Sequence, residues 1–344
     1  MSAKSLSVGS QSGRPTEPGS LAGLLLAAAI AGFALWLGRM VPVVGGPVIG
    51  IVAGIIVRNV FSPGSRYDPG IRFASKHVLQ WSIIALGAGL SLSQVARTGM
   101  HSLAVTAVTI TVAGVAAWGL GKLLGVGGKL KLLIGVGTAI CGGSAIAAVT
   151  PIIKPDDHET AFAISTIFLF NLVAVLLFPA LGHLLHLSDA GFGMWAGTAI
   201  NDTSSVVAAG YTYSKAAGDY ATVVKLTRAT LIIPICLALT VAVAYRAKQS
   251  GAAQFSLSRV FPWFILWFLV ASAIRTANLI PATWQPVIHD AAEFMIIVAL
   301  TAIGLSSNLR RMAATGIRPV LLGLGVWVAV SVSSLAVQLV AGQL

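Results

Sequence analysis

The stretch WAGTAINDTSSVVAAG, from Trp195 to Gly210, places five consecutive polar residues in the middle of an apolar segment. The polar run is Asn201-Asp202-Thr203-Ser204-Ser205, and its neighbours are mostly Ala, Val, Ile and Gly. An acid and four hydrogen-bonding side chains are costly in apolar surroundings unless they find partners. What surrounds this segment therefore decides both the fold and the purpose of its polar centre.

The composition of the chain indicates that the surroundings are lipid. Of the 344 residues, 56% are hydrophobic and only 9% are charged, and the mean hydropathy is +0.90. Soluble domains carry roughly 25% charged residues. Long apolar runs recur along the chain, and a membrane-spanning helix needs about 20 mostly apolar residues. The sequence therefore predicts an all-α polytopic membrane protein.

About 10 to 11 transmembrane segments follow from the apolar runs, by their length. Residues 1–20 are rich in Ser, Gly and Pro and are expected to form a disordered cytoplasmic tail, followed by one transmembrane domain over 21–344. The expected segments are 20–38, 43–60, 76–93, 102–121, 129–152, 159–186, 190–211, 219–245, 259–278, 286–308 and 316–341.

The positions of the basic residues predict the orientation. The formal net charge is +12, but Lys and Arg lie in alternate links between apolar runs rather than in one patch. This pattern follows the positive-inside rule, so we expect a cytoplasmic N-terminus and an external C-terminus. The bilayer, and not nucleic acid, is the partner that this charge predicts.

Two of the expected segments are unusual, 129–153 and 190–211. Gly137-Thr-Ala-Ile in the first recurs as Gly197-Thr-Ala-Ile in the second, and each tetrapeptide precedes a glycine-rich or polar interruption. A second echo is Gly89-Leu-Ser and Gly304-Leu-Ser. Internal repeats with interrupted helices in corresponding positions point to a transporter's binding site. The sequence thus predicts an inverted-repeat architecture with two discontinuous helices that meet at mid-membrane.

Interrupted helices suit a site because they free backbone groups. Gly142-Gly143-Ser144 and Thr203-Ser204-Ser205 can each start a half-helix, whose unpaired N–H groups attract anions. If both segments cross the membrane, they run parallel. If both are re-entrant, they enter from opposite faces and the GTAI halves oppose each other. The charge pattern does not distinguish these alternatives.

Ionisable groups inside apolar segments are functional candidates. Asp202 is either a helix cap or ion-pair partner, or a proton-coupling site, which we favour. Lys225 and Arg228 share one helix face and either snorkel to an interface or bind an anion, which we favour. Asn171 suits helix packing or a site contact equally. For Cys141 at the first interruption we favour a small packing residue over a reactive thiol, and for Arg58 and Glu293 near segment ends we favour an interfacial position over a functional one.

Four stretches together resemble the YeiH-like sulfate-exporter family of bacterial inner-membrane proteins: CGGSAIAAVTPII, FLFNLVAVLLFPALGHLL, GTAINDTSSVVAAG and VVKLTRATLIIP. The resemblance covers nearly the whole chain after the tail. It implies the superfamily of cation:proton antiporters and bile-acid:sodium symporters, whose inverted repeats place discontinuous helices at mid-membrane. The implied substrate-site positions are Cys141, Gly142, Gly143, Ser144, Asn171, Asn201, Thr203, Ser204, Ser205, Lys225 and Arg228, with Asp202 as the proton-coupling residue.

The expected function is secondary active transport of a small anion, sulfate or a sulfonate, coupled to protons by alternating access. The alternative is a sodium or cation:proton antiporter in which Asp202, Asn201 and Thr203 bind the cation. A channel is less favoured. An enzyme is not expected, because the sequence has no G-x-S-x-G and no H-E-x-x-H motif. No cofactor or resident metal is expected, and a homodimer stays open.

Overall fold

The computed structural model describes residues 18–40, 45–247, 262–307, 309 and 316–343, and these residues form helices without any strand. Residues 1–17 of the expected tail lie outside the described residues, and the first helix begins at Pro18. Each of the eleven expected apolar segments coincides with one helix or with consecutive helices. The chain is therefore an all-helical, multi-pass membrane protein.

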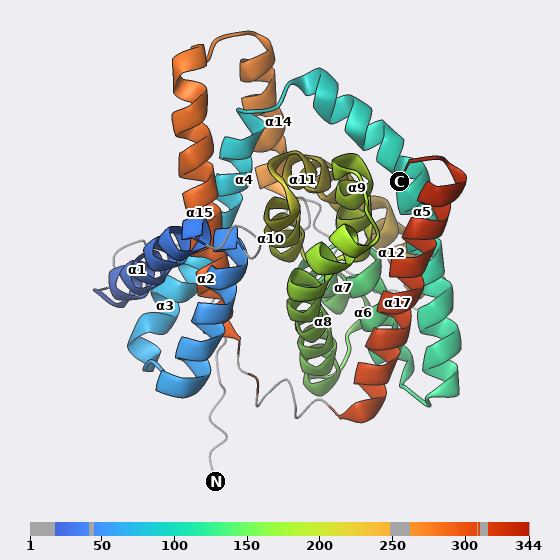
Figure 1. Ribbon diagram of the computed structural model, residues 1–344. Helices are drawn as coiled ribbons and strands as arrows, with labels where there is room; N and C mark the ends of the chain where they lie inside the picture. The colour runs from blue at the N-terminus through green and yellow to red at the C-terminus, as the bar shows by residue number, and fades with distance from the viewer. Residues whose placement is uncertain (1–17, 41–44, 248–261, 308, 310–315, 344) are drawn as a thin grey trace.

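The helices form two groups on the two sides of the molecule (Figure 1). We call the first the scaffold group; it contains α1 (Pro18–Met40), α2 (Gly45–Ile56), η1 (Val57–Phe61), η2 (Ser65–Tyr67), α3 (Asp68–Phe73), η3 (Ala74–Val78), α4 (Leu79–Gly87), α14 (Trp263–Thr276), η4 (Ala282–Trp284) and α15 (Gln285–Ser306).

We call the second the hairpin group, after the two helical hairpins at its centre. It contains α5 (Leu92–Leu123), α6 (Gly128–Ala139), α7 (Gly143–Ile153), α8 (Asp157–Leu184), α9 (Asp189–Ala199), α10 (Thr203–Tyr213), α11 (Lys215–Thr230), α12 (Ile232–Ala247) and α17 (Ile317–Val340). In Figure 1, α5 and α17 form its outer side, and α10 and α11 lie toward the scaffold group.

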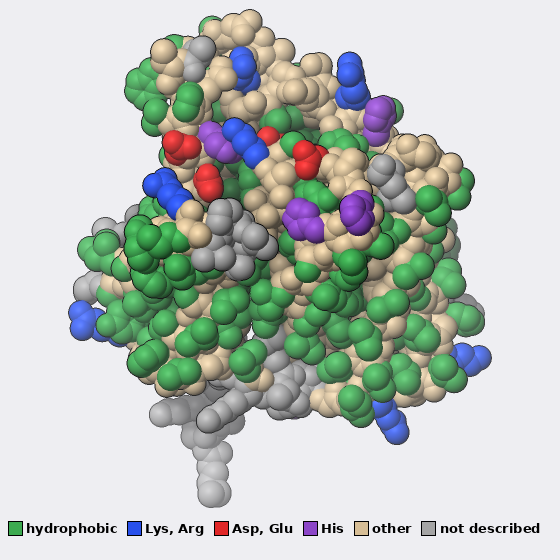
Figure 2. All heavy atoms as spheres, viewed as in Figure 1, with side chains coloured by type: hydrophobic (Ala, Val, Ile, Leu, Met, Phe, Trp, Pro, Cys, Tyr) green, Lys and Arg blue, Asp and Glu red, His purple; other side chains and the backbone are tan. Residues whose placement is uncertain are grey.

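Six helices of the described part are long and apolar enough to cross a membrane: Leu21–Met40, Leu92–Leu123, Asp157–Leu184, Lys215–Val243, Gln285–Ser306 and Ile317–Val340. Large apolar side chains such as Trp36, Val115, Trp118 and Trp267 are more than half exposed, as lipid-facing residues would be. Figure 2 shows apolar side chains over most of the lower part of the visible face, while acidic and histidine side chains gather in its upper part.

Side-chain caps fix where several of these helices begin. Ser91 caps α5 in a capping box with Gln94, and Asp156 caps α8 in a capping box with Glu159. Ser188 accepts a hydrogen bond from the backbone N–H of Gly191 at the start of α9, at 3.0 Å. These residues satisfy N–H groups that the first helical turn cannot pair within the helix.

The scaffold group is held together by close backbone contact between α2 and α15. A Cβ atom built on Gly54 would lie 2.3 Å from the carbonyl oxygen of Thr301, and one on Gly304 would lie 2.2 Å from that of Ile51. Only glycine permits this approach at both positions. Small residues commonly bring helices together in membranes, where lipid competes for apolar contact.

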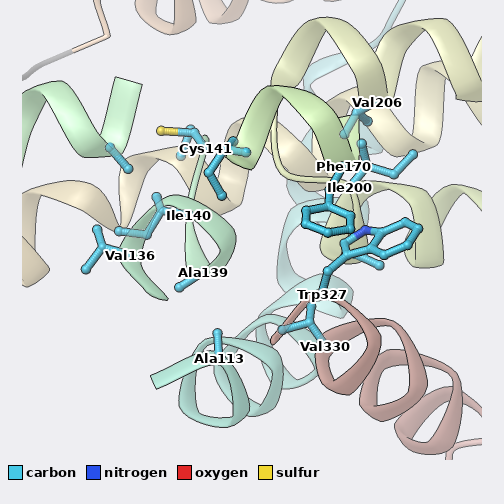
Figure 3. Packing of buried hydrophobic residues seen from close by; sticks show 14 of the residues in the cluster. Ala113, Val136, Ala139, Ile140, Cys141, Phe170, Ile200, Val206, Trp327 and Val330 are labelled. Atoms are coloured by element: carbon cyan, nitrogen blue, oxygen red, sulfur yellow. The ribbon is translucent and has the colours of Figure 1, made fainter. Parts of the chain in front are cut away.

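The hairpin group has a large apolar core with stacked aromatic rings. Phe170 of α8 and Trp327 of α17 lie with ring centroids 5.4 Å apart, and Phe178 stacks on Trp195 at 4.1 Å. Figure 3 shows these two α8–α17 rings beside Ile200 and Val206, with Ala139, Ile140 and Cys141 on the other side of the cluster. This core surrounds the two helix interruptions that the sequence singles out.

Candidate functional site

The first interruption forms the tip of a helical hairpin. α6 ends at Ala139 and α7 begins at Gly143, with Ile140, Cys141 and Gly142 between them. The Lys129 ammonium donates a hydrogen bond to the carbonyl oxygen of Lys154 at 2.7 Å. Because this contact joins the first turn of α6 to the end of α7, the chain returns to the end where it started.

The second interruption forms the tip of another hairpin. α9 ends at Ala199 and α10 begins at Thr203. At the open end, the Ser214 hydroxyl donates to Asp189 Oδ1 at 2.6 Å, and the rings of Phe192 and Tyr213 stack at 3.9 Å. The start of α9 and the end of α10 are therefore adjacent.

The two hairpins point toward each other along α8. The α6–α7 hairpin connects to the first turn of α8, and the α9–α10 hairpin connects to its last turn. α8 has 28 residues, which is about 42 Å of helix. The two segments therefore form opposed helical hairpins, and their GTAI halves face each other.

The tips of the hairpins meet beside the middle of α8. Gly142 adopts φ +68°, and a Cβ atom built on it would lie 3.3 Å from the Cβ of Asp202. The Asn171 side-chain oxygen accepts a hydrogen bond from the backbone N–H of Asp202 at 3.1 Å. Asp202 also caps α10, because its Oδ2 accepts from the N–H of Ser204 at 3.1 Å and from the Ser204 hydroxyl.

Lys225 and Arg228 connect the two hairpin tips through hydrogen bonds to backbone carbonyl groups. Lys225 Nζ donates to the carbonyl oxygens of Ile140 at 2.8 Å and Ile200 at 2.9 Å. Arg228 donates to the carbonyl oxygens of Thr138 at 2.6 Å, Ala139 at 2.6 Å and Thr198. Both side chains are fully buried.

These two cations bind equivalent atoms of the GTAI segments. Thr138 and Thr198 are equivalent positions and share Arg228, while Ile140 and Ile200 are equivalent and share Lys225. The last carbonyl groups of a helix lack intrahelical partners and carry partial negative charge. The buried cations thus satisfy the carbonyl groups at the ends of α6 and α9. The starts of α7 and α10 lie on the opposite side of the tips.

A cavity of about 580 Å³ lies on that other side, between the hairpin tips and the scaffold group. The tips contribute Ser144, Asp202, Thr203 and Ser204 to its wall. The scaffold group contributes two cationic side chains and several uncharged polar ones: Arg58, Lys76, Ser75, Gln80, Ser306 and Ser307. The wall therefore combines hydroxyl groups and positive charge with one carboxyl group.

The cavity lies along the first half of α8, since Ile164, Ser165 and Phe168 form part of its wall. Toward the second half of α8, apolar residues of α2, α8, α10 and α15 pack directly on one another, among them Val48, Val175, Val207 and Ile296. The scaffold and hairpin groups are thus separated by a cavity at one end and joined by an apolar seal at the other.

The predicted site residues divide into three sets. Ser144, Asp202, Thr203 and Ser204 line the cavity, and Gly142 and Gly143 form the adjoining tip. Cys141, Asn171, Asn201 and Ser205 are buried in or beside the tips. Lys225 and Arg228 lie at the tip carbonyl groups, so the structure does not bring them to the cavity wall.

The sequence interpretation missed Arg58 and Lys76 as cavity residues. The sequence favours an interfacial position for Arg58 at a segment end, and it presents Lys76 only as one of the basic residues between apolar runs. These two residues come close to the hairpin tips only because the scaffold group packs against the hairpin group. The one signal that could have pointed there is Gly304-Leu305-Ser306, because Ser306 lines the same cavity.

Several buried polar atoms near the tips have no hydrogen-bond partner in the described part of the chain. They include the amide nitrogen and the amide oxygen of the Asn201 side chain, and the amide nitrogen of the Asn171 side chain. Buried polar groups are rarely left unpaired. Within the same residues, no group of three or more His, Cys, Asp and Glu side chains is placed to hold a metal ion.

Comparison with known proteins agrees with the class of protein that this fold defines, a multi-pass membrane protein. Residues 22–323 match the family described as Conserved hypothetical protein 698, and the chain belongs to this family.

Three relatives, all called UPF0324 membrane protein, illustrate the extent of the similarity. The relative in Fusobacterium nucleatum is 41% identical over 343 residues, covering 94% of this chain and 98% of the relative. The one in Streptococcus pyogenes serotype M6 is 44% identical over 333 residues, covering 94% and 97%. The one in Clostridium tetani is 38% identical over 335 residues, covering 93% and 97%. These names state no substrate.

Proposed function

We propose that the protein is a secondary active transporter of a small anion, sulfate or a sulfonate, coupled to protons by alternating access. The observation that carries the proposal is the cavity at which two opposed hairpin tips meet the scaffold group. Interrupted helices at a site between two helix groups are the usual way in which transporters hold ions. The family membership and the multi-pass fold agree with a transporter in general.

An anion suits the donors on the cavity wall. Ser144 and Thr203 are hydroxyl donors in the first turns of α7 and α10, and the Ser204 hydroxyl beside them donates to Asp202. The residue before α7, Gly142, has no side chain to cap the helix, so the N–H groups of Gly143 and Ser144 remain available to a ligand, while that of Ala145 contacts the Cys141 sulfur. Positive side chains on the opposite wall complement the charge of an oxyanion.

Asp202 is the proposed proton carrier. It is the acidic residue of the cavity wall, and its carboxylate accepts two hydrogen bonds from Ser204. A protonated carboxyl group next to a bound anion removes one unit of repulsion. Release of the proton would then favour release of the anion, which couples the two movements.

The seal on the far side of the tips supports alternating access. One end of the interface between the two groups contains the cavity, and the other is closed by apolar contacts of α2, α8, α10 and α15. Lys129 and Lys154 lie at the cavity end of α8. By the positive-inside rule this end is cytoplasmic, so the proposal makes the present state inward-facing.

The same proposal includes the inverted repeat, a location in the bacterial inner membrane, a cytoplasmic N-terminus and an external C-terminus. With both hairpins re-entrant, the segments that cross the membrane are reduced by two, so the two ends of the chain stay on opposite sides. A homodimer is compatible with this arrangement. The proposal needs no cofactor and assigns no enzymatic step.

A sodium or cation:proton antiporter is the second candidate. The observation that favours it is the position of Asp202 beside Thr203 and Ser144 on one cavity wall, because carboxylate and hydroxyl oxygens also suit a hard cation. In this case a sodium gradient would drive proton movement in vesicles that contain no transportable anion. Anion transport predicts no such movement.

The test of the leading proposal is labelled sulfate flux in proteoliposomes under an imposed pH gradient. We compare the intact protein with Asp202→Asn, since Asn caps helices as well as Asp and keeps the fold. Asp157→Asn, an exposed acid at the start of α8, is the matched control. Gradient-driven flux that loses its pH dependence only in Asp202→Asn supports the proposal. Folded protein without flux of sulfate, sulfonates or other small anions refutes it.

A further inference from the structure

The positive charge of the cavity wall comes from the scaffold group. Arg58 and Lys76 are the cationic residues of the wall, and both lie opposite the hairpin tips. Lys225 and Arg228, in contrast, are fully buried behind the tips, and each donates to at least two backbone carbonyl oxygens. A bound anion would therefore meet the scaffold cations first.

Both cavity cations lie on π-helical turns. Arg58 belongs to η1 and Lys76 to η3, and these are the π-helical segments of the described residues. A π turn costs stability relative to an α turn, is rare, and occurs frequently at functional sites. Its wider turn rotates the residues on it relative to a regular helix. Two such turns facing one cavity are an independent indication that these side chains are placed for binding.

The two cations differ in whether an acidic neighbour already compensates their charge. Arg58 Nη1 forms an ion pair with Asp68 Oδ1 at 3.1 Å and donates to the carbonyl oxygen of Pro63 at 3.3 Å. Lys76 forms no ion pair with any described residue, and its side chain is exposed. Lys76 is thus a positive charge that the described protein leaves uncompensated at the cavity.

We propose that Lys76, supported by Arg58, is the principal cation that binds the transported oxyanion, and that Lys225 and Arg228 only position the hairpin tips. This inference rests on the proposed anion transport and names the residues that select its substrate class. The anion binds with one side against the hydroxyl groups of Ser144 and Thr203 and the other against Lys76. The scaffold and hairpin groups both contribute to the site.

The charges around the cavity also link anion binding to a proton. Arg58 is paired with Asp68, which leaves Lys76 and Asp202 as the charges of opposite sign on the wall. A proton on Asp202 leaves the charge of Lys76 available to an oxyanion.

The experiment uses full-length protein, and it measures binding and transport separately. Binding is followed as the shift of the thermal unfolding midpoint of detergent-purified protein with increasing sulfate, thiosulfate, phosphate or methanesulfonate, against chloride at equal ionic strength. Transport is followed as labelled sulfate flux. The variants are Lys76→Gln, Lys76→Arg and the matched control Arg72→Gln. Arg72 is an exposed cation one helical turn from Lys76 and does not line the cavity.

We expect Lys76→Gln to raise the sulfate concentration for half-maximal binding and flux by about tenfold or more, the size of a lost charge-assisted hydrogen bond. Lys76→Arg keeps the charge and stays within about threefold of the intact protein. Arg72→Gln changes neither value. Since Lys76 is exposed, none of these variants endangers folding.

The outcomes separate the two proposals. If the intact protein binds and transports an anion but Lys76→Gln does so equally well, the role of Lys76 is refuted and anion transport stands. Equal losses in Lys76→Gln and Arg72→Gln also refute it, because they indicate only the general positive field of this end. If no anion of the series binds to or is carried by the folded intact protein, both proposals fail.

Discussion

The molecule uses two pairs of cations in opposite ways. Lys225 and Arg228 are completely buried and donate to carbonyl groups of the chain, whereas Arg58 and Lys76 lie on a cavity wall. A buried charge must be fully partnered, and backbone oxygens at two helix ends are good partners. Lys76 has no ion-pair partner among the described residues and lines an accessible cavity, so its charge is free to bind a ligand. The comparison teaches that the most buried charges of a membrane protein are not always its substrate contacts.

The largest expected effect tests the structural pair. Arg228→Met leaves the carbonyl groups of Thr138, Ala139 and Thr198 buried without a donor. Each unsatisfied buried group costs about 1–3 kcal/mol, so we expect a loss of at least about 3 kcal/mol in stability. The measurement is the thermal unfolding midpoint of purified protein, with yield of monodisperse material as a second readout.

Arg228→Lys is the informative companion of that variant. It keeps the charge but cannot reach three carbonyl groups with the planar fork of a guanidinium. If Arg228 acts through geometry, Arg228→Lys is also destabilised. A folded and stable Arg228→Lys protein that lacks flux would instead indicate that Arg228 binds the substrate. It would contradict the contrast between the two pairs of cations.

Lys225→Met is expected to have the next largest effect. It removes one charge and leaves the carbonyl oxygens of Ile140 and Ile200 without their common donor, at a cost of about 2 kcal/mol or more. Stability falls, and the sulfate dependence of the remaining folded fraction is unchanged. Thermal unfolding with and without sulfate checks this. A selective loss of the sulfate-induced shift would contradict a purely structural Lys225.

Much of this site could be predicted from the sequence because its signals are local. These signals are the GTAI repeat, the glycines at the first interruption and the Asp-Thr-Ser run at the second. Each determines where a helix ends or begins in its own stretch of backbone. The structure accordingly begins α7 at Gly143 and α10 at Thr203. Asp202, the acid of the second interruption, lies on the cavity wall.

The partners of the charges could not be predicted, for a physical reason. Lys225 and Arg228 bind backbone carbonyl groups, which every residue has, so no residue type at the acceptor positions identifies the contact. Lys76 and the hairpin tips come from separate helix groups, and their proximity depends on apolar packing of α2 and α15 against α8 and α10, which includes Ile296 and Val207. Apolar packing of this kind leaves no specific spacing in one sequence.

A smaller effect on stability, with a larger one on transport, is expected at the tip itself. Gly142→Ala places a Cβ at φ +68° and ψ −129°, a conformation that L-residues rarely adopt and that costs about 1–3 kcal/mol, and brings it to 3.3 Å from the Cβ of Asp202. Gly143→Ala is the matched control, because a Cβ there meets no atom within 4 Å. Sulfate flux should fall in Gly142→Ala and persist in Gly143→Ala. Equal flux in both would show that the tip geometry is not critical.

The smallest change in stability is expected at Asn201, where it separates a packing residue from a ligand residue. Asn201 is 1% exposed, and neither atom of its side-chain amide has a partner among the described residues. Replacement by an apolar side chain of similar volume removes unpaired polar atoms, so Asn201→Leu should leave stability within about 0.5 kcal/mol or raise it.

Transport by Asn201→Leu then gives the decisive reading. If the amide binds the anion in another state of the transport cycle, flux falls although the unfolding midpoint does not. The lost contact then belongs to the anion-bound state and does not stabilise the present one. If flux and stability are both unchanged, Asn201 is a packing residue, and the site reduces to the cavity-lining groups. Asn171→Leu is the contrast: its oxygen accepts from the N–H of Asp202, so this variant should lose stability as well as flux.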